Sequence, residues 1–163
     1  MMTATTPAQR DQHREWLLEL TAIPTAAGHE HRVIRWIESW VKRRKNLKLA
    51  RDKAGNLFIT HAKPSRAKNA PRPVFITAHL DHPAFVVTKI VSEYTVELEF
   101  RGGVHDPYFE NAVIEIIDAK DRAHAATIST LDSTARPFKR VTAELREPAP
   151  SLKPGDVGRW QLP

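Results

Sequence analysis

The sequence contains no cysteine among its 163 residues, which excludes disulfide bonds and thiolate metal ligands. Any bound metal must therefore be held by histidine, aspartate or glutamate, a ligand set that suits zinc, cobalt or manganese. No apolar run reaches the roughly 18 residues of a membrane span, so we expect no membrane partner. Residues 1–7 lack the apolar stretch of a secretory signal peptide. These absences favour a cytoplasmic protein.

Basic residues outnumber acidic ones, 25 to 19, which gives a formal net charge of +6. They gather in Lys42–Lys45 and again in residues 63–72. A nucleic-acid-binding module is one possible interpretation of such charge. No stacking aromatic residues accompany the clusters, however, and cations are favourable at the C-terminal end of a helix. We therefore interpret the clusters as a helix end and a solvated loop, and expect no nucleic-acid partner.

Two helices are predicted in the first quarter of the chain. Thr6-Pro7 combines a capping hydroxyl with proline at the first helical position, which predicts a helix over Ala8–Ala22 that Pro24 prevents from continuing. A second helix is predicted from His29 to Arg44 because apolar residues recur at helical spacing along it. We interpret the tryptophans of both helices as packing residues; they are Trp16, Trp36 and Trp40.

Short apolar runs after the helices predict strands. Leu47–Ala50 and Leu57–His61 flank a turn-forming segment and predict an antiparallel hairpin. Val74–Ala78 has the length and β-branched character of a buried central strand, with His79 directly after it. The remainder of the chain is β-rich, without a convincing helix, and predicts a small barrel or sandwich. Its expected strands are Phe85–Val91, Tyr94–Phe100, Ala112–Ile117, His124–Thr130 and Lys139–Leu145.

The segment His79-Leu80-Asp81-His82 carries the chemistry that is easiest to identify. A histidine and an aspartate two positions apart at a strand's carboxyl end project to the same side, at the edge where open α/β sheets place their ligands. Such a pair can bind a metal through the imidazole and orient the ring through the carboxylate. An isolated pair of this kind would more often be a chance occurrence in a loop. The neighbouring sequence therefore decides whether the pair is interpreted as a metal site.

That context resembles the N-terminal part of the zinc-dependent exopeptidases, and most closely the tetrahedral and deblocking (glutamyl) aminopeptidases. The matching segments occur in the family's order and together extend over nearly the whole chain. They are Ile23–Glu30, Asp52–Leu57, His79-Leu80-Asp81, Phe85–Ile90, Gly102-Gly103 and Lys153–Asp156. The chain departs from the family pattern at His82, where glutamate is usual, and at Pro83-Ala84.

The resemblance implies an α/β fold. Residues 1–84 would form part of a zinc-exopeptidase-like (phosphorylase/hydrolase-like) catalytic domain that is incomplete. Residues 85–163 would form a small all-β, barrel-like inserted domain, which in the family helps to assemble the oligomer. The expected activity is removal of N-terminal residues from peptides, and the expected partners are a peptide substrate and further copies of the chain.

The resemblance also assigns roles to two residues. His79 would be a ligand of one of two catalytic metals, with zinc expected, and Asp81 would be the catalytic-site carboxylate that orients the imidazole. The family's remaining site residues include an adjacent Glu-Glu pair and a late histidine. This sequence has no two adjacent acidic residues and no histidine after His124. We therefore expect the chain to be the N-terminal portion of an aminopeptidase, with the missing ligands in a C-terminal half.

Two other groups of polar residues are candidate substitute ligands. His105 and Asp106 lie among turn-forming residues and are interpreted as a solvated loop. Asp118, Asp121 and His124 are interpreted as a hairpin turn. The alternative function is that of a non-catalytic relative, acting as an assembly or partner-binding module. Because the predicted sheet is left with an open edge, we also expect poor solubility or self-association of the chain alone.

Overall fold

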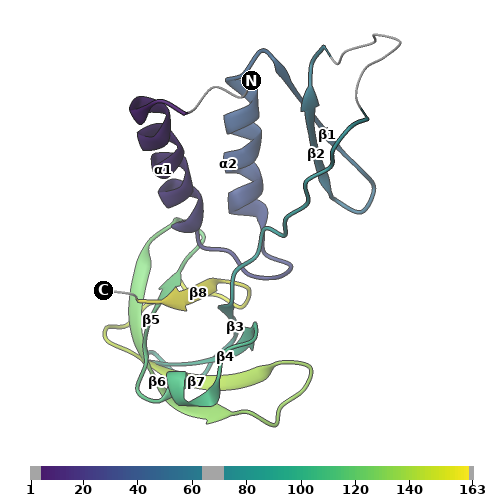
Figure 1. The fold of residues 1–163 in the computed structure, drawn as a ribbon. Helices are drawn as coiled ribbons and strands as arrows, with labels where there is room; N and C mark the ends of the chain where they lie inside the picture. Colours follow the sequence, from purple (N-terminus) through teal and green to yellow (C-terminus); the bar gives the residue numbers. More distant parts are fainter. Residues whose placement is uncertain (1–4, 64–71, 162–163) are drawn as a thin grey trace.

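The secondary-structure elements form two groups, which follow one another along the sequence (Figure 1). The computed structural model describes residues 5–63 and 72–161. The first group contains helices α1 (Pro7–Thr21) and α2 (His31–Lys42) and strands β1 (Leu47–Arg51) and β2 (Leu57–His61). The second contains strands β3 to β8, with a short 3₁₀ helix over Asp106–Phe109. Within the described ranges, neither α-helix is long and apolar enough to cross a membrane.

Helix α1 begins where the sequence predicts it. The Thr6 hydroxyl accepts a hydrogen bond from the Gln9 backbone, and the Gln9 side chain accepts one from the Thr6 backbone, which completes a capping box. Pro7 occupies the first turn. Leu17 and Leu18 near the end of the helix are 59% and 58% exposed, so α1 is weakly buried.

Helix α2 packs mainly through Val33 and Val41, which are both buried. The Arg44 guanidinium lies 3.5 Å from the centre of the Trp40 ring and 4.6 Å from that of Trp16. These cation–π contacts tie the C-terminal end of α2 to α1. The interpretation of the tryptophans as packing residues is therefore confirmed for Trp16 and Trp40.

Strands β1 and β2 form the predicted antiparallel hairpin, with Leu47 opposite His61 and Arg51 opposite Leu57. The Asp52 carboxylate closes the turn by accepting hydrogen bonds from the backbone and side-chain amides of Asn56, each at 2.8 Å. Gly55 has a φ of +95°, which other residues rarely adopt. The local turn chemistry thus fixes the register of this hairpin.

The predicted strand over Val74–Ala78 is wrong. These residues form no regular structure, and Val74, Phe75 and Ile76 are 86%, 79% and 93% exposed. A strand is defined by the backbone of its neighbour, and among the described residues none pairs with this run. His79 is therefore presented by an extended loop, and the described part of the first group is a helix pair beside a two-stranded hairpin instead of an α/β sheet.

The β-rich half is a closed six-stranded barrel, so the choice between a barrel and a sandwich is settled in favour of the barrel. The strands follow the order β3-β4-β7-β6-β5-β8, and closure leaves no unpaired edge. The predicted runs match five of these strands closely at both ends; β8 had not been predicted. Their bounds are β3 (Ala84–Ile90), β4 (Thr95–Arg101), β5 (Val113–Ile117), β6 (Ala123–Asp132), β7 (Lys139–Leu145) and β8 (Val157–Trp160).

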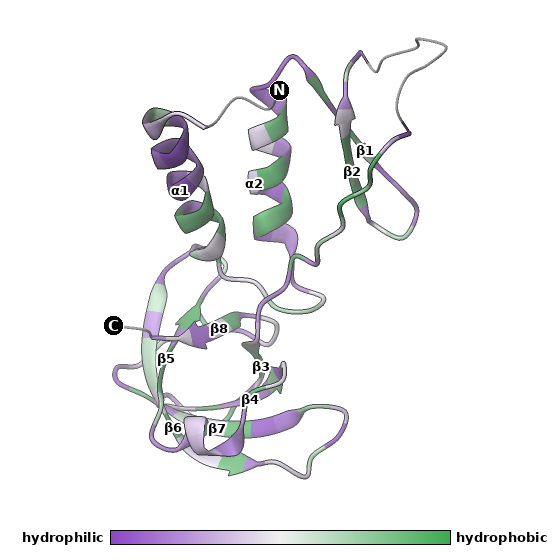
Figure 2. Cartoon of the chain, in the orientation of Figure 1, coloured by the Kyte–Doolittle hydropathy of each residue, from purple (hydrophilic) through white to green (hydrophobic). Residues whose placement is uncertain are grey.

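Alternation along the strands builds the barrel core. In β4, Val96, Leu98 and Phe100 are buried while the residues between them are half-exposed. An aromatic cluster fills the interior, with the ring of Phe85 5.1 Å from Phe100 and 4.3 Å from Trp160. Figure 2 shows the same alternation as green and purple bands on the barrel strands. The division of the chain into domains at residue 84 stays a prediction.

Candidate functional site

His79 and Asp81 lie together in the loop that leads into β3. The Nδ1 atom of His79 is 3.1 Å from Oδ1 of Asp81 and 3.0 Å from its carbonyl oxygen. When Nδ1 carries the proton it donates to Asp81, and the lone pair of Nε2 is then free to bind a ligand. The His79 side chain is 82% exposed, so this nitrogen is accessible.

The loop is held in place by the turn between the two helices. The hydroxyl of Thr25, which is buried, donates a 3.4 Å hydrogen bond to the carbonyl of Leu80, between His79 and Asp81. The next residue, Ala26, packs in a small buried cluster with Ala84 of β3. Two segments of the resemblance, the turn and the His-x-Asp loop, are thus in contact in the folded chain.

Two separate cavities open on either side of this loop. His79 and Asp81 line a groove of about 800 Å³ together with residues of α2 and β2. His82 instead lines a cavity of about 760 Å³, which also includes the end of α1 and residues of β8. The two histidines therefore line different cavities, and of the two only His79 shares a cavity with Asp81.

The ligand inventory around His79 is incomplete. Over the described ranges, no group of three or more histidine, aspartate or glutamate side chains is close enough to hold a metal. His79, with an oriented ring and an accessible Nε2, fits the role of a single ligand, and Asp81 fits that of its orienting carboxylate. The donor set thus suits one part of a metal site, with the remaining ligands to come from other residues.

The substitute ligands are used elsewhere. Asp106 begins the 3₁₀ helix and forms an ion pair with Lys139 of β7, and this contact holds the pKa of the Asp106 carboxyl below its usual range. We predicted a solvated loop at His105 and Asp106. This prediction is modified, because Asp106 forms an ion pair with Lys139. The turn interpretation for residues 118–124 is confirmed: β5 and β6 are antiparallel, and Ile117 lies opposite Ala123.

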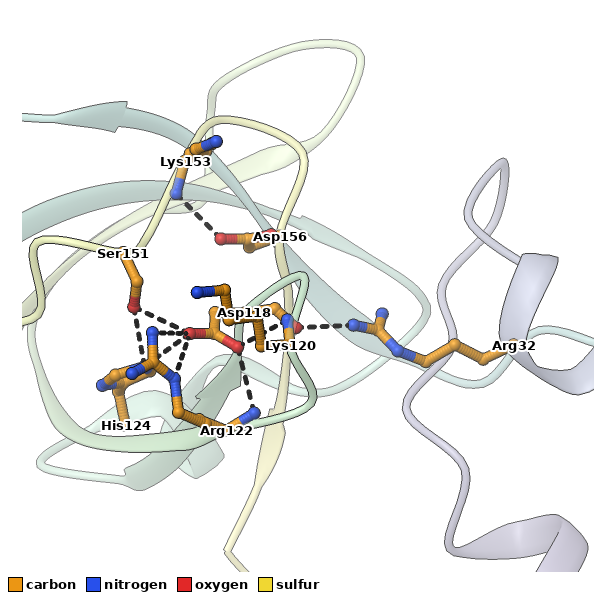
Figure 3. A network of polar contacts seen from close by, with 8 residues as sticks. All are labelled: Arg32, Asp118, Lys120, Arg122, His124, Ser151, Lys153 and Asp156. Atoms are coloured by element: carbon orange, nitrogen blue, oxygen red, sulfur yellow. Dashed lines mark hydrogen bonds and ion pairs between the residues drawn. The ribbon is translucent and has the colours of Figure 1, made fainter.

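The sequence does not predict that Asp118 in that turn is buried. Asp118 is 1% exposed and accepts hydrogen bonds from the backbones of Lys120 and Arg122, from the Arg122 guanidinium and from the Ser151 hydroxyl, at 2.7–3.0 Å. His124 lies 3.4 Å away (Figure 3). Burial alone would raise the pKa of Asp118, but these hydrogen bonds, led by that of Ser151, hold it well below its usual range.

Arginine side chains connect the helical group to the barrel. Arg32 of α2 reaches the β5–β6 turn, where it donates to the Asp118 carbonyl at 2.8 Å (Figure 3). It also donates to the Asp121 carboxylate at 2.7 Å. Arg159 of β8 donates to the Ala22 carbonyl at 2.6 Å. Each guanidinium satisfies a backbone acceptor on the other group, so these contacts hold the helical group against the barrel.

The Lys153–Asp156 segment, another part of the resemblance, forms the turn before β8. The Asp156 carboxylate accepts a 2.8 Å hydrogen bond from the Lys153 backbone, and Gly155 has a φ of +95°. Val87 of β3 exchanges backbone hydrogen bonds with this turn. The motif therefore closes the barrel beside the strand that follows the His79 loop, a structural role consistent with its place in the chain.

The network predicts a pH dependence of stability. Because the folded-state pKa of Asp118 is lowered, its contribution is fully present above the ordinary value of 3.8 and is lost as the pH falls through the folded-state value. Asp118→Asn should lower the thermal unfolding midpoint at pH 7 and flatten its decline below pH 3.8. Differential scanning calorimetry measures both, with the exposed Asp11→Asn as control. An unchanged pH profile in Asp118→Asn would contradict the assignment.

Comparison with known proteins places this geometry in context. No model of a known protein family matches the chain. A curated relative, "Putative aminopeptidase YhfE" of Bacillus subtilis, is 27% identical over 125 residues, which make up 77% of this chain and 35% of that protein. Among solved structures, the TET1 peptidase of Pyrococcus horikoshii aligns with a TM-score of 0.64 at 18% identity, over 90% of this chain and 46% of that one. The aminopeptidase APDkam598 of Desulfurococcus kamchatkensis aligns with a TM-score of 0.69 at 17% identity, over 93% and 44%.

These likenesses define the class of fold. The chain has the fold of one part of aminopeptidase chains, and it spans about a third of the curated relative and less than half of the solved structures. The predicted resemblance to aminopeptidases is supported at this level. The TET1 peptidase can itself assemble into a tetrahedron or a large octahedral shell.

Proposed function

We propose that this chain is the N-terminal portion of a zinc-dependent aminopeptidase of the tetrahedral (glutamyl) type, which removes N-terminal residues from peptides. The observation that carries the proposal is the geometry of His79, whose ring is oriented by Asp81 and whose Nε2 atom is accessible at the edge of a groove. The curated relative and the shared fold support the same assignment.

Within such an enzyme the two residues have different tasks. His79 would hold the metal through Nε2, and Asp81 would accept the hydrogen bond from Nδ1, which fixes the tautomer and increases the basicity of the ring. The chemistry that zinc, or cobalt or manganese in its place, would supply there is Lewis-acid polarisation of the scissile carbonyl. The general base and the remaining ligands are supplied by the rest of the enzyme, since the described part of this chain offers no third ligand at the loop.

Assembly is the second part of the proposal. The closed barrel corresponds to the inserted domain that helps to assemble the oligomer in the resembled family, so it is the proposed contact unit for further copies of the enzyme. We place the assembled homo-oligomer in the cytoplasm. The ability of the TET1 peptidase to assemble into large shells supports an oligomeric enzyme here.

A zinc titration of the purified chain tests the ligand assignment. We expect at most one weak site per chain, because a single imidazole with its orienting carboxylate cannot hold a metal tightly. His79→Ala should abolish that site, and His61→Ala, at an exposed position of β2, should leave it intact. Isothermal calorimetry with elemental analysis measures both. Two tightly bound metals per chain, or binding that survives in His79→Ala, would contradict the proposal.

The same titration addresses a second function. The described residues combine an incomplete ligand set with a complete barrel, which favours a non-catalytic relative that acts in assembly or partner binding. A chain that binds no metal yet forms a defined oligomer would support this alternative.

A further inference from the structure

A second cavity lies where the C-terminal end of α1 meets the barrel. Its volume is about 760 Å³, within the range of roughly 300–1,000 Å³ that is typical of small-molecule sites. In Figure 1 the end of α1 approaches the barrel beside β5 and β8, the two strands that supply an ion pair to the cavity wall. Neither His79 nor Asp81 lines this cavity, so a ligand bound in it would not occupy the proposed metal position.

The ion pair in the wall has unused hydrogen-bonding groups. Arg159 of β8 donates to Oε2 of Glu115 of β5 through Nε at 3.1 Å and Nη2 at 3.0 Å, and its Nη1 atom donates to the Ala22 carbonyl at 2.6 Å. Each terminal nitrogen of the guanidinium carries a second N–H. The other oxygen of Glu115, Oε1, accepts no hydrogen bond from the residues that the structure describes. The two side chains are 41% and 23% exposed, so both charges are accessible to a ligand.

Apolar side chains form much of the remaining wall. They come from the end of α1, the turn after it, the start of β3 and the end of β8, and include Leu18, Ile23, Pro24, Pro83 and Trp160. A ligand without charges would bury the unused groups of the ion pair without partners, which is unfavourable. A ligand with a single charge would match only one of the two residues. The wall therefore fits a molecule that carries both charges close together and an apolar group beside them.

We infer that this cavity binds a free α-amino acid with an apolar side chain. Its ammonium and carboxylate groups are attached to one carbon atom, so they lie side by side, as the charges of Glu115 and Arg159 do. The ammonium donates to Oε1 of Glu115, the carboxylate accepts from the unused N–H groups of Arg159, and the side chain packs against the apolar wall. A dipeptide fits less well, because a peptide unit separates its two charges. The inference rests on the proposed function in one respect, since an aminopeptidase releases free amino acids.

Isothermal calorimetry on the purified chain tests the inference with four defined probes. L-leucine should bind at a single site, and glycine should bind at least about 10-fold more weakly because it buries no side chain. L-leucinamide lacks the carboxylate, and N-acetyl-L-leucine lacks the ammonium group. Each loses a hydrogen bond between charged groups and should also bind at least about 10-fold more weakly than leucine.

Glu115→Gln provides a test that misfolding cannot imitate. The variant keeps the shape of the side chain but removes its charge, so leucine binding should weaken by at least about 10-fold. The charge of Arg159 is then unmatched, and the variant should prefer N-acetyl-L-leucine to leucine, the reverse of the wild type. Glu110→Gln is the matched control, because Glu110 is exposed and lies outside the cavity. It should leave both affinities unchanged.

Three outcomes would overturn the inference. They are an absence of leucine binding, equal affinities of the wild type for leucine and N-acetyl-L-leucine, and tighter binding of the dipeptide leucyl-leucine than of leucine. The proposed function is tested separately, because the calorimetry requires neither metal nor hydrolysis. Selective leucine binding by a chain whose complete enzyme releases no N-terminal residues would leave the amino-acid site established and count against the proposed function alone.

Discussion

If the proposed aminopeptidase function is correct, His79→Ala should eliminate hydrolysis of N-terminal residues from peptides. The substitution removes the only imidazole that the described structure places in the groove beside an orienting carboxylate. Loss of an orienting partner alone typically costs about 10- to 100-fold in metal affinity or activity, so loss of the ligand itself should exceed about 100-fold. The measurement is kcat/KM on an unblocked peptide, with zinc content determined in parallel.

Asp81→Asn is a second variant, whose smaller expected loss of activity can be compared with that of His79→Ala. The variant keeps an acceptor oxygen near Nδ1 of His79 but removes the negative charge, so we expect a decrease of about 10- to 100-fold together with weaker zinc binding. His13→Ala, at an exposed position of α1, is the control and should leave the rate unchanged. Full activity in His79→Ala would remove the ligand role, and an unchanged rate in Asp81→Asn would show that Asp81 only shapes the loop.

Local sequence signals predicted the elements that depend on few neighbours. The start of α1 follows from Thr6-Pro7 because the cap and the first turn are completed within four residues. The β1–β2 hairpin follows from the Asp52–Asn56 turn for the same reason. In the barrel, the alternation Glu97-Leu98-Glu99-Phe100 predicts a half-exposed strand, and these residues lie in β4. The pattern cannot distinguish a barrel from a sandwich, because both bury one face of each strand.

The wrong prediction of a strand at Val74–Ala78 shows what local sequence signals cannot predict. Its composition is typical of a buried strand, and the prediction assumed neighbours that the described chain does not provide. An apolar run indicates that a segment is suited to a buried environment. A strand forms only if its backbone also has a hydrogen-bonding partner. The sequence of this segment is therefore suited to a sheet that the described residues do not complete.

The arginine contacts and the Asp118 network were missed for another reason. Arg32 and Asp118 are 86 residues apart, and no spacing rule connects a helix residue to a distant turn. The only local signal was an aspartate directly after the apolar run Val113–Ile117, where a polar side chain at the end of a buried strand needs partners. His79 and Asp81, by contrast, were found because their contact spans only two residues.

Phe85→Ala is expected to have the largest effect on stability. The side chain of Phe85 is fully buried in the barrel, and its ring lies 4.3 Å from that of Trp160, 5.1 Å from that of Phe100 and 6.0 Å from that of Phe109. Removing a phenyl ring from such a cluster costs the transfer free energy of the ring and leaves a cavity that a closed barrel cannot easily collapse. The free energy of unfolding should fall by about 3–5 kcal/mol.

Chemical denaturation monitored by tryptophan fluorescence measures this change, since Trp160 belongs to the same cluster. Tyr108→Ala removes an aromatic ring that is 67% exposed and should alter stability by no more than about 0.5 kcal/mol. A loss in Phe85→Ala no larger than that in Tyr108→Ala would contradict close packing of the aromatic cluster around this ring.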